Sequence, residues 1–233
     1  MSRYHYFGIF AALTFMLTVL GLYYQLALVL KRRTNFLENS LEHERPTNIL
    51  SLNQLSSIFL ACYSFFLYGI CVNPINHYLA WPRFIAMLIL ILLFYQILID
   101  RLNLWSRAVF YLACSMLLAS SLVFWFTKYI QQSVKYLAQG LVVFATIVLA
   151  QGYIHQILLM RRSFSTGAVS IRFHQCVLMT ALSTVAFGIA IGVKDGWPLI
   201  LLASVSATLK LITLWHFRWV RISKATQKKK RYK

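Results

Sequence analysis

The stretch GYIHQILLMRRSFSTGAVS, residues 152–170, joins two apolar segments through a pair of arginines and a Ser-Thr-Gly loop. The first segment carries His155 and Gln156 near its end, and a serine opens the second segment. The same order occurs once before, where YYQLALVLKRR (residues 23–33) is followed by a polar loop and a second apolar segment from Ser51. A motif that returns with the same neighbours on both sides predicts a duplicated structural unit.

The composition indicates the class of protein. Of 233 residues, 60% are apolar or aromatic and 12% are charged, and the mean hydropathy is +0.67. Several apolar runs approach the ~20 residues that a helix needs to cross a bilayer, whereas barrel strands would be ~10 residues long and alternating. We therefore expect an all-α membrane protein with seven transmembrane helices, at 6–30, 51–71, 81–99, 107–127, 136–160, 173–193 and 197–216.

The net charge of +18 indicates membrane topology, because most of the 23 Lys and Arg lie in short loops and a tail on one side of the spans. That side is expected to be cytoplasmic, with the N-terminus outside and the C-terminus inside. In this count Arg83 belongs to the outer side, and Lys210 is the basic residue inside a span. A bacterial inner membrane and a eukaryotic endomembrane fit equally well. The basic tail, 217–233, is expected to lie on anionic phospholipid.

The spans divide into two triplets around a linker. Residues 6–99 and 136–216 can be laid on each other, and the fourth span, 107–127, stands between them. One intervening helix gives both triplets the same orientation, so we expect two parallel three-helix repeats joined by a linker helix (3+1+3). The matched positions are Tyr24-Gln25 with His155-Gln156, Ser51 with Ser170, Ser64 with Ser183, Tyr68-Gly69 with Phe187-Gly188, and Trp81-Pro82 with Trp197-Pro198.

This combination of repeat, glutamine motif, basic pair and loop resembles the PQ-loop superfamily, which includes SWEET sugar transporters, cystinosin-like amino-acid exporters and the KDEL receptor. The resemblance implies a transporter that exposes a cavity to each side of the membrane in turn. It also implies a gate or hinge at Gln25, Gln156, His155 and Tyr24, where the family has Pro-Gln pairs. Both prolines are absent here. Arg83 and Leu199 stand where SWEETs have sugar-binding asparagines, so that role is not carried over.

The candidate solute site combines the seventh span with the second span of each repeat. Lys210 forms a stripe with Ala203, Ser206 and Thr213 at spacings of three and four, which should face the bundle interior. A retinal Schiff base on Lys210 is an alternative, but it needs a counter-ion, and the third span offers only Asp100 at its end. The residues expected to bind the solute are Lys210, Ser206, Ser64, Tyr68, Ser183 and Phe187.

These features predict facilitated movement of a small polar solute, of the sugar or amino-acid class. We expect no enzymatic activity, no catalytic residue, no cofactor and no metal, since no metal-ligand spacing occurs. The expected partners are the lipid bilayer, anionic phospholipid at the basic tail and the small-molecule solute, without nucleic acid, and association into a homo-oligomer is left open. The alternative function is a receptor, scaffold or assembly factor that kept the fold and lost transport, which the missing prolines favour.

Overall fold

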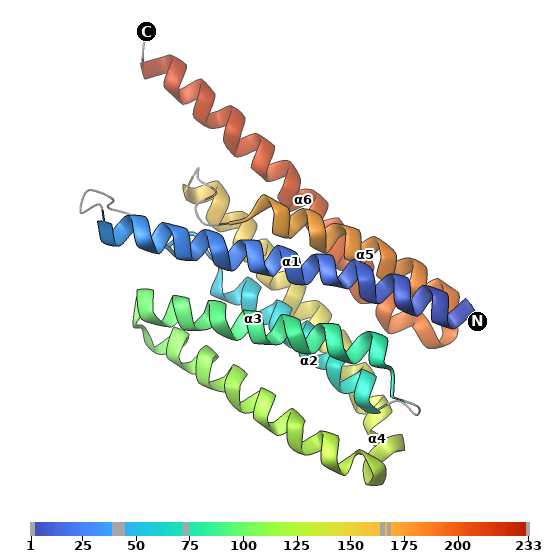
Figure 1. The fold of residues 1–233 in the computed structure, drawn as a ribbon. Helices are drawn as coiled ribbons and strands as arrows, with labels where there is room; N and C mark the ends of the chain where they lie inside the picture. Colours follow the sequence, from blue (N-terminus) through green and yellow to red (C-terminus); the bar gives the residue numbers. More distant parts are fainter. Residues whose placement is uncertain (1–2, 39–44, 72–74, 164–165, 167–168, 232–233) are drawn as a thin grey trace.

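The computed structural model describes residues 3–38, 45–71, 75–163, 166 and 169–231. Its helices are α1 (Arg3–Glu38), α2 (Leu52–Cys71), α3 (His77–Arg101), α4 (Leu104–Ser163), α5 (Ile171–Ile191) and α6 (Val193–Arg231). The 60 residues of α4 would extend ~90 Å as a straight helix. Figure 1 shows its ribbon leaving the end of α3 and then turning back through the bundle. Helix α4 therefore contains two membrane-length segments, Leu104–Ser121 and Gln139–Ser163, which with the five other helices gives seven rods in the described part of the chain.

Six helical segments within the described residues are long and apolar enough to cross a membrane. They are His5–Phe36, His77–Arg101, Leu104–Ser121, Gln139–Ser163, Ile171–Ala190 and Gly196–Val220. The third and fourth both belong to α4 and correspond to the predicted spans 107–127 and 136–160. The predicted span 51–71, which corresponds to α2, is not among the six. The protein is an integral membrane protein.

The two repeats pack across each other. α1 contacts α5 as well as α3, and α2 contacts α4 as well as α3. The first helix of each repeat therefore lies against the second helix of the other, and Figure 1 shows α1 running along α5. The first rod of α4 lies at the edge of the bundle, where a linker helix is expected. The all-α architecture of two parallel triplets and a linker is confirmed.

Two glycines permit this close packing between the repeats. A Cβ added at Gly21 of α1 would lie 2.9 Å from the Cα of Phe173 on α5, and one at Gly152 of α4 would lie 3.0 Å from the Cα of Gln54 on α2. Backbone atoms limit both contacts, so a side chain cannot be added unless a helix shifts. Each glycine stands four residues before a motif glutamine, as GLYYQ and GYIHQ. The repeats therefore share a G-x-x-x-Q pattern at the helix contact.

Several helix ends differ from the sequence prediction. α1 continues past residue 30 to Glu38, and α6 continues through the basic tail to Arg231, beyond the body of the bundle in Figure 1. Trp81-Pro82 and Trp197-Pro198 were expected to open their helices, and this is wrong. α3 begins at His77, because the Asn76 side chain accepts a hydrogen bond from Leu79 N at 3.2 Å and caps the helix earlier. Pro82 and Pro198 consequently lie inside α3 and α6.

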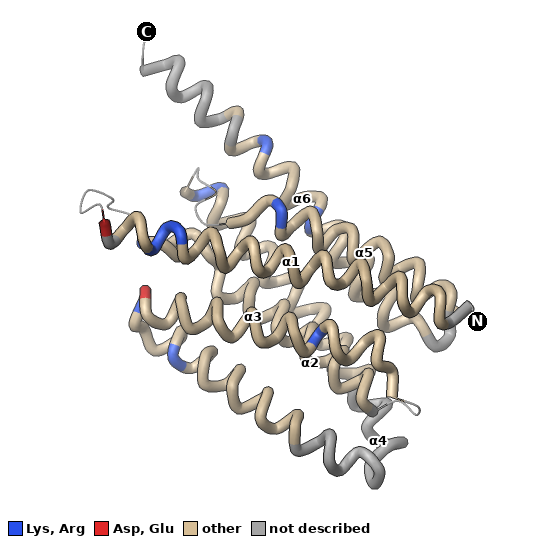
Figure 2. Tube along the Cα trace, in the orientation of Figure 1, with Lys and Arg blue, Asp and Glu red and all other residues tan. Residues whose placement is uncertain are grey.

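The described Lys and Arg gather at one end of the bundle, where α1 and α3 end and α2 and α5 begin (Figure 2). We call this the basic end. Arg83 departs from the pattern: it belongs to α3 and is only 2% exposed. The prediction that Arg83 lies on the outer side is therefore wrong. Arg83 is buried inside the bundle, as Lys210 also is. The stripe of Ala203, Ser206, Lys210 and Thr213 is buried, as predicted.

Candidate functional site

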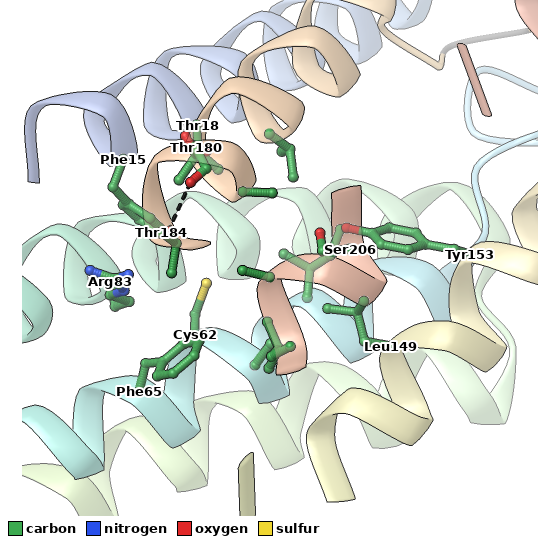
Figure 3. Close-up of a pocket in the computed structure, with 16 residues that line it drawn as sticks. Phe15, Thr18, Cys62, Phe65, Arg83, Leu149, Tyr153, Thr180, Thr184 and Ser206 are labelled. Atoms are coloured by element: carbon green, nitrogen blue, oxygen red, sulfur yellow. Dashed lines mark hydrogen bonds between the residues drawn. The ribbon is translucent and has the colours of Figure 1, made fainter. Parts of the chain in front are cut away.

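A cavity of about 80 Å³ lies between the two repeats and is lined by side chains from α1 to α6 (Figure 3). Most of its wall is apolar, with Phe15, Phe65, Leu149 and Leu202 among the lining residues. The polar and sulfur-bearing side chains of the wall are Thr18, Cys62, Arg83, Tyr153, Thr180, Thr184 and Ser206. Pockets that hold drug-sized ligands measure ~300–1,000 Å³, so this conformation is contracted around a space for a few small groups.

The threonines of the wall donate their hydrogen bonds within the protein. Thr18 Oγ1 donates to Thr180 Oγ1 at 2.7 Å, which ties α1 to α5. Thr180 Oγ1 lies 2.6 Å from the Thr14 carbonyl, and Thr184 Oγ1 donates to the Thr180 carbonyl at 2.8 Å. On the other side of the cavity, Tyr153 and Ser206 place their hydroxyls in the wall. These hydroxyls hold the helices together and offer a solute mainly acceptor oxygens.

Arg83 carries the charge of the cavity. Pro82 has no N–H, so the carbonyl of Tyr78, four residues earlier, loses its helical donor. The Arg83 guanidinium turns back onto this carbonyl at 3.3 Å and onto that of Leu79 at 3.4 Å. Its Cζ lies 4.2 Å from the centre of the Phe15 ring, a cation–π contact. Both hydrogen bonds are long, and the Nε–H is buried without a hydrogen-bond partner.

Lys210 lies one turn beyond Ser206 toward the basic end, and it is not part of the cavity wall. Its Nζ is 2.8 Å from His174 Nδ1 and lies over the rings of Tyr153 at 3.9 Å and Phe173 at 4.7 Å. When the ammonium donates, Nδ1 accepts and the ring proton stays on Nε2 of His174, which is buried without a partner. The contacts of the Lys210 ammonium are therefore with His174 and with the rings of Tyr153 and Phe173.

Gln25 and Gln156 join the repeats at matched places. Gln25 Oε1 accepts a hydrogen bond from Ser170 N at 2.7 Å, and Gln156 Oε1 accepts one from Ser51 N, also at 2.7 Å. Gln156 Nε2 also donates to the Ile49 carbonyl at 3.0 Å. Ser51 and Ser170 directly precede α2 and α5, and their backbone N–H groups have no helical acceptor. Each motif glutamine thus satisfies the N–H of the residue that precedes the other repeat's second helix.

The other two residues of the predicted gate flank these glutamines. His155 Nδ1 lies 2.8 Å from Ser51 Oγ, and Tyr24 lies under the Arg172 guanidinium, 4.9 Å from the ring centre. Of the predicted loop at 165–170, Thr166, Val169 and Ser170 are described, and the rest lies outside the described residues. The structure therefore brings the four predicted gate residues to one level of the bundle, near the basic end.

The predicted solute-binding residues are spread more widely. Ser206 lines the cavity. Ser64 and Ser183 are buried and lie within hydrogen-bond distance of their own helix at Ala61 and Thr180. Phe187 is 1% exposed within the apolar core, and Tyr68 is partly buried against it. In this conformation these four do not belong to the wall, and their role in binding stays a prediction.

Sequence reasoning missed Arg83 and the threonines of the wall. Arg83 shares its face of α3 with Ala86, Met87 and Leu90, all 0% exposed, at spacings of three, four and seven. That periodicity could have placed Arg83 inside the bundle. The pair Trp81-Pro82 led instead to the prediction of a surface position for Arg83, since this pair is typical of a helix start at the membrane surface. Because α3 begins at His77, five residues before Pro82, Arg83 lies inside the bundle.

No family model and no curated protein matches the chain. A solved structure does: a eukaryotic SWEET transporter, determined at 3.7 Å resolution, aligns with 94% of this chain and 99% of its own. The TM-score is 0.57 and the sequence identity is 15%, so the similarity lies in the fold. It agrees with the all-helical membrane fold of seven rods described above. The chain therefore has the fold of a SWEET transporter.

Proposed function

We propose that this protein moves a small polar solute, of the sugar or amino-acid class, across its membrane by facilitated alternating access. The observation that carries the proposal is the cavity between the two repeats, which is lined by polar side chains from both. The fold shared with a SWEET transporter supports it. A site at the interface of parallel repeats can be opened to either side when one repeat rocks against the other.

The closed side of the cavity lies toward the basic end. There Gln25, Gln156, Tyr153, Phe173 and Lys210 are each no more than 2% exposed, and we call these five residues the packed layer. Opening this side requires the layer to separate, which breaks the three glutamine bonds between the repeats. At a net ~0.5–1.5 kcal/mol each, they amount to ~1.5–4.5 kcal/mol. This matches the few kcal/mol that commonly separate two conformations of one protein.

Equilibrium counterflow in proteoliposomes tests the proposal with a panel of labelled sugars and amino acids. We expect saturable exchange of at least one solute. Ala203→Trp should abolish that exchange, because Ala203 is 2% exposed and lines the cavity. Leu201→Trp places the same side chain on an exposed position of α6 and should preserve it. The proposal fails if no solute exchanges, or if Ala203→Trp exchanges as fast as the parent.

A receptor or scaffold is the second candidate, favoured by the packed layer together with the two missing prolines, which leaves α1 and α4 without a proline hinge. Cys62 lines the cavity and distinguishes the two functions. In a variant with the other three cysteines replaced by alanine, alternating access predicts that membrane-impermeant thiol reagents modify Cys62 from both sides. Modification from one side only would identify a static receptor.

A further inference from the structure

We infer that the solute bound in this cavity is a small organic carboxylate with an apolar body, and that Arg83 is the residue that binds its carboxylate. This inference rests on the proposed function for the movement of a small polar solute, and it replaces the sugar or amino-acid class with that of organic carboxylates. Three observations lead to it: the unmet donors of Arg83, the position of the acidic residues, and the apolar wall around the guanidinium.

The Arg83 guanidinium is poorly satisfied by the protein. It has five N–H donors, and its described hydrogen bonds reach two carbonyls at 3.3 and 3.4 Å, longer than the usual 2.7–3.2 Å. A buried cation normally has an anionic partner, because desolvation without one costs several kcal/mol. Arg83 lines the cavity, as Figure 3 shows, so a partner bound there can reach it.

Within the part of the chain that the structure describes, Arg83 makes its hydrogen bonds to carbonyls and none to an acidic side chain. The sequence has five acidic residues: Glu38, Glu42, Glu44, Asp100 and Asp195. On α3 itself, Asp100 is 17 residues from Arg83, ~26 Å along the helix, and it accepts from Thr47 N at 3.0 Å. The other buried cation, Lys210, is held by His174 and two rings. An anionic solute bound in the cavity would supply the negative charge that Arg83 does not receive from α3.

The rest of the wall selects among anions. Phe15 and Phe65 lie on the guanidinium, with Cζ 4.2 and 5.5 Å from the ring centres, and leave its edge for a planar acceptor. A carboxylate matches that edge with two parallel hydrogen bonds. The mostly apolar wall suits a hydrocarbon body. The threonine hydroxyls already donate elsewhere, so a sugar would find few donors, and an ammonium group would find no carboxylate among the described wall residues.

The test measures the thermal stability of the purified full-length chain with 3-methylbutanoate and with 3-methylbutanamide, which has the same shape without the charge. We expect the acid to raise the melting temperature saturably and the amide to leave it unchanged. Sodium chloride and sodium phosphate at equal ionic strength should have no such effect. Equal stabilisation by the amide would overturn the inference, and equal stabilisation by chloride or phosphate would show an unspecific anion site, which also overturns it.

Arg83→Met should weaken 3-methylbutanoate binding by about 30-fold or more, the usual result of removing one partner of a buried charge pair. Arg172→Met is the matched control, because it removes an arginine that also lies on an aromatic ring but is exposed at the basic end. If Arg83→Met does not fold, Arg83→Lys keeps the charge without the planar fork and should still bind more weakly than the parent. Unchanged binding in the Arg83 variant that folds overturns the inference.

The outcome is separable from that of the proposed function. Saturable binding of 3-methylbutanoate without counterflow would support the anion site and contradict transport. Counterflow of a neutral sugar that persists in Arg83→Met would support transport and contradict the anion site.

Discussion

Replacing Gln156 with leucine should destabilise the protein by a predictable amount. The amide of Gln156 bonds to Ser51 N at 2.7 Å and to the Ile49 carbonyl at 3.0 Å, and Gln156, Ser51 and Ile49 are 0%, 1% and 5% exposed. Leucine fills a similar volume but leaves both backbone groups unpaired. A buried group without its partner costs ~1–3 kcal/mol, so the free energy of unfolding should fall by ~2–6 kcal/mol.

The measurement is thermal unfolding of the detergent-purified protein, monitored by tryptophan fluorescence. For a chain of this size, 1 kcal/mol shifts the melting temperature by ~2–4 °C, so the lower bound of ~2 kcal/mol predicts a fall of ~4–8 °C. The matched control is Gln151→Leu on the same helix, because Gln151 is exposed and the leucine there should be harmless. Gln25→Leu should resemble Gln156→Leu, since Gln25 makes the matched bond to Ser170 N.

Two results would refute this reasoning. A melting temperature of Gln156→Leu equal to that of the parent would mean that the glutamine does not stabilise the start of α2. An equal fall in Gln151→Leu would mean that the effect comes from losing any amide on α4, wherever it points.

Further predictions follow from the glycines, the buried lysine and the charge distribution. Gly152→Ala should destabilise by ~1–3 kcal/mol through overpacking against α2, whereas Gly140→Ala, with open space around it, should be neutral or slightly stabilising; equal melting temperatures would contradict the proposed helix contact. Lys210→Met should destabilise by orphaning His174 Nδ1, and the double variant with His174→Phe should recover most of the loss in thermal unfolding; no recovery would argue against the pair. Reporter fusions after residue 233 should be active in the cytoplasm, and an external tail would overturn the orientation inferred from charge.

The helices were predictable because crossing a membrane imposes long apolar runs on the sequence. The repeat was predictable because Gln25 and Gln156 keep the same neighbours in both copies. The start of α3 was not, since Asn76 caps the helix through one side-chain bond that composition does not indicate. That difference of a single turn moved Arg83 from the predicted outer side to the cavity wall.

The packing of α1 on α5 and of α2 on α4 could not be predicted from the apolar pattern. An apolar face indicates that a helix is buried, but it does not indicate which helix covers it. Glycine offers a better signal. Gly21 and Gly152 mark the points where two backbones meet, and their shared spacing to the motif glutamines is readable from the sequence alone. The cavity itself depends on how far the two repeats have closed, which no local pattern encodes.

The exchange of caps between repeats has a consequence for synthesis of the protein. The backbone N–H of Ser51 waits for Gln156, which is 105 residues further along the chain. At a translation rate of ~5–20 residues per second, α2 must remain in the membrane for ~5–20 s with the Ser51 N–H unsatisfied. The first triplet therefore reaches the bilayer as an incomplete unit, dependent on lipid, water or a helper protein until the second triplet arrives. A ribosome that stalls after α3 would leave a three-helix product in which the Ser51 N–H and the Ile49 carbonyl lack their Gln156 partner, the kind of unpaired polar group that membrane quality control can recognise.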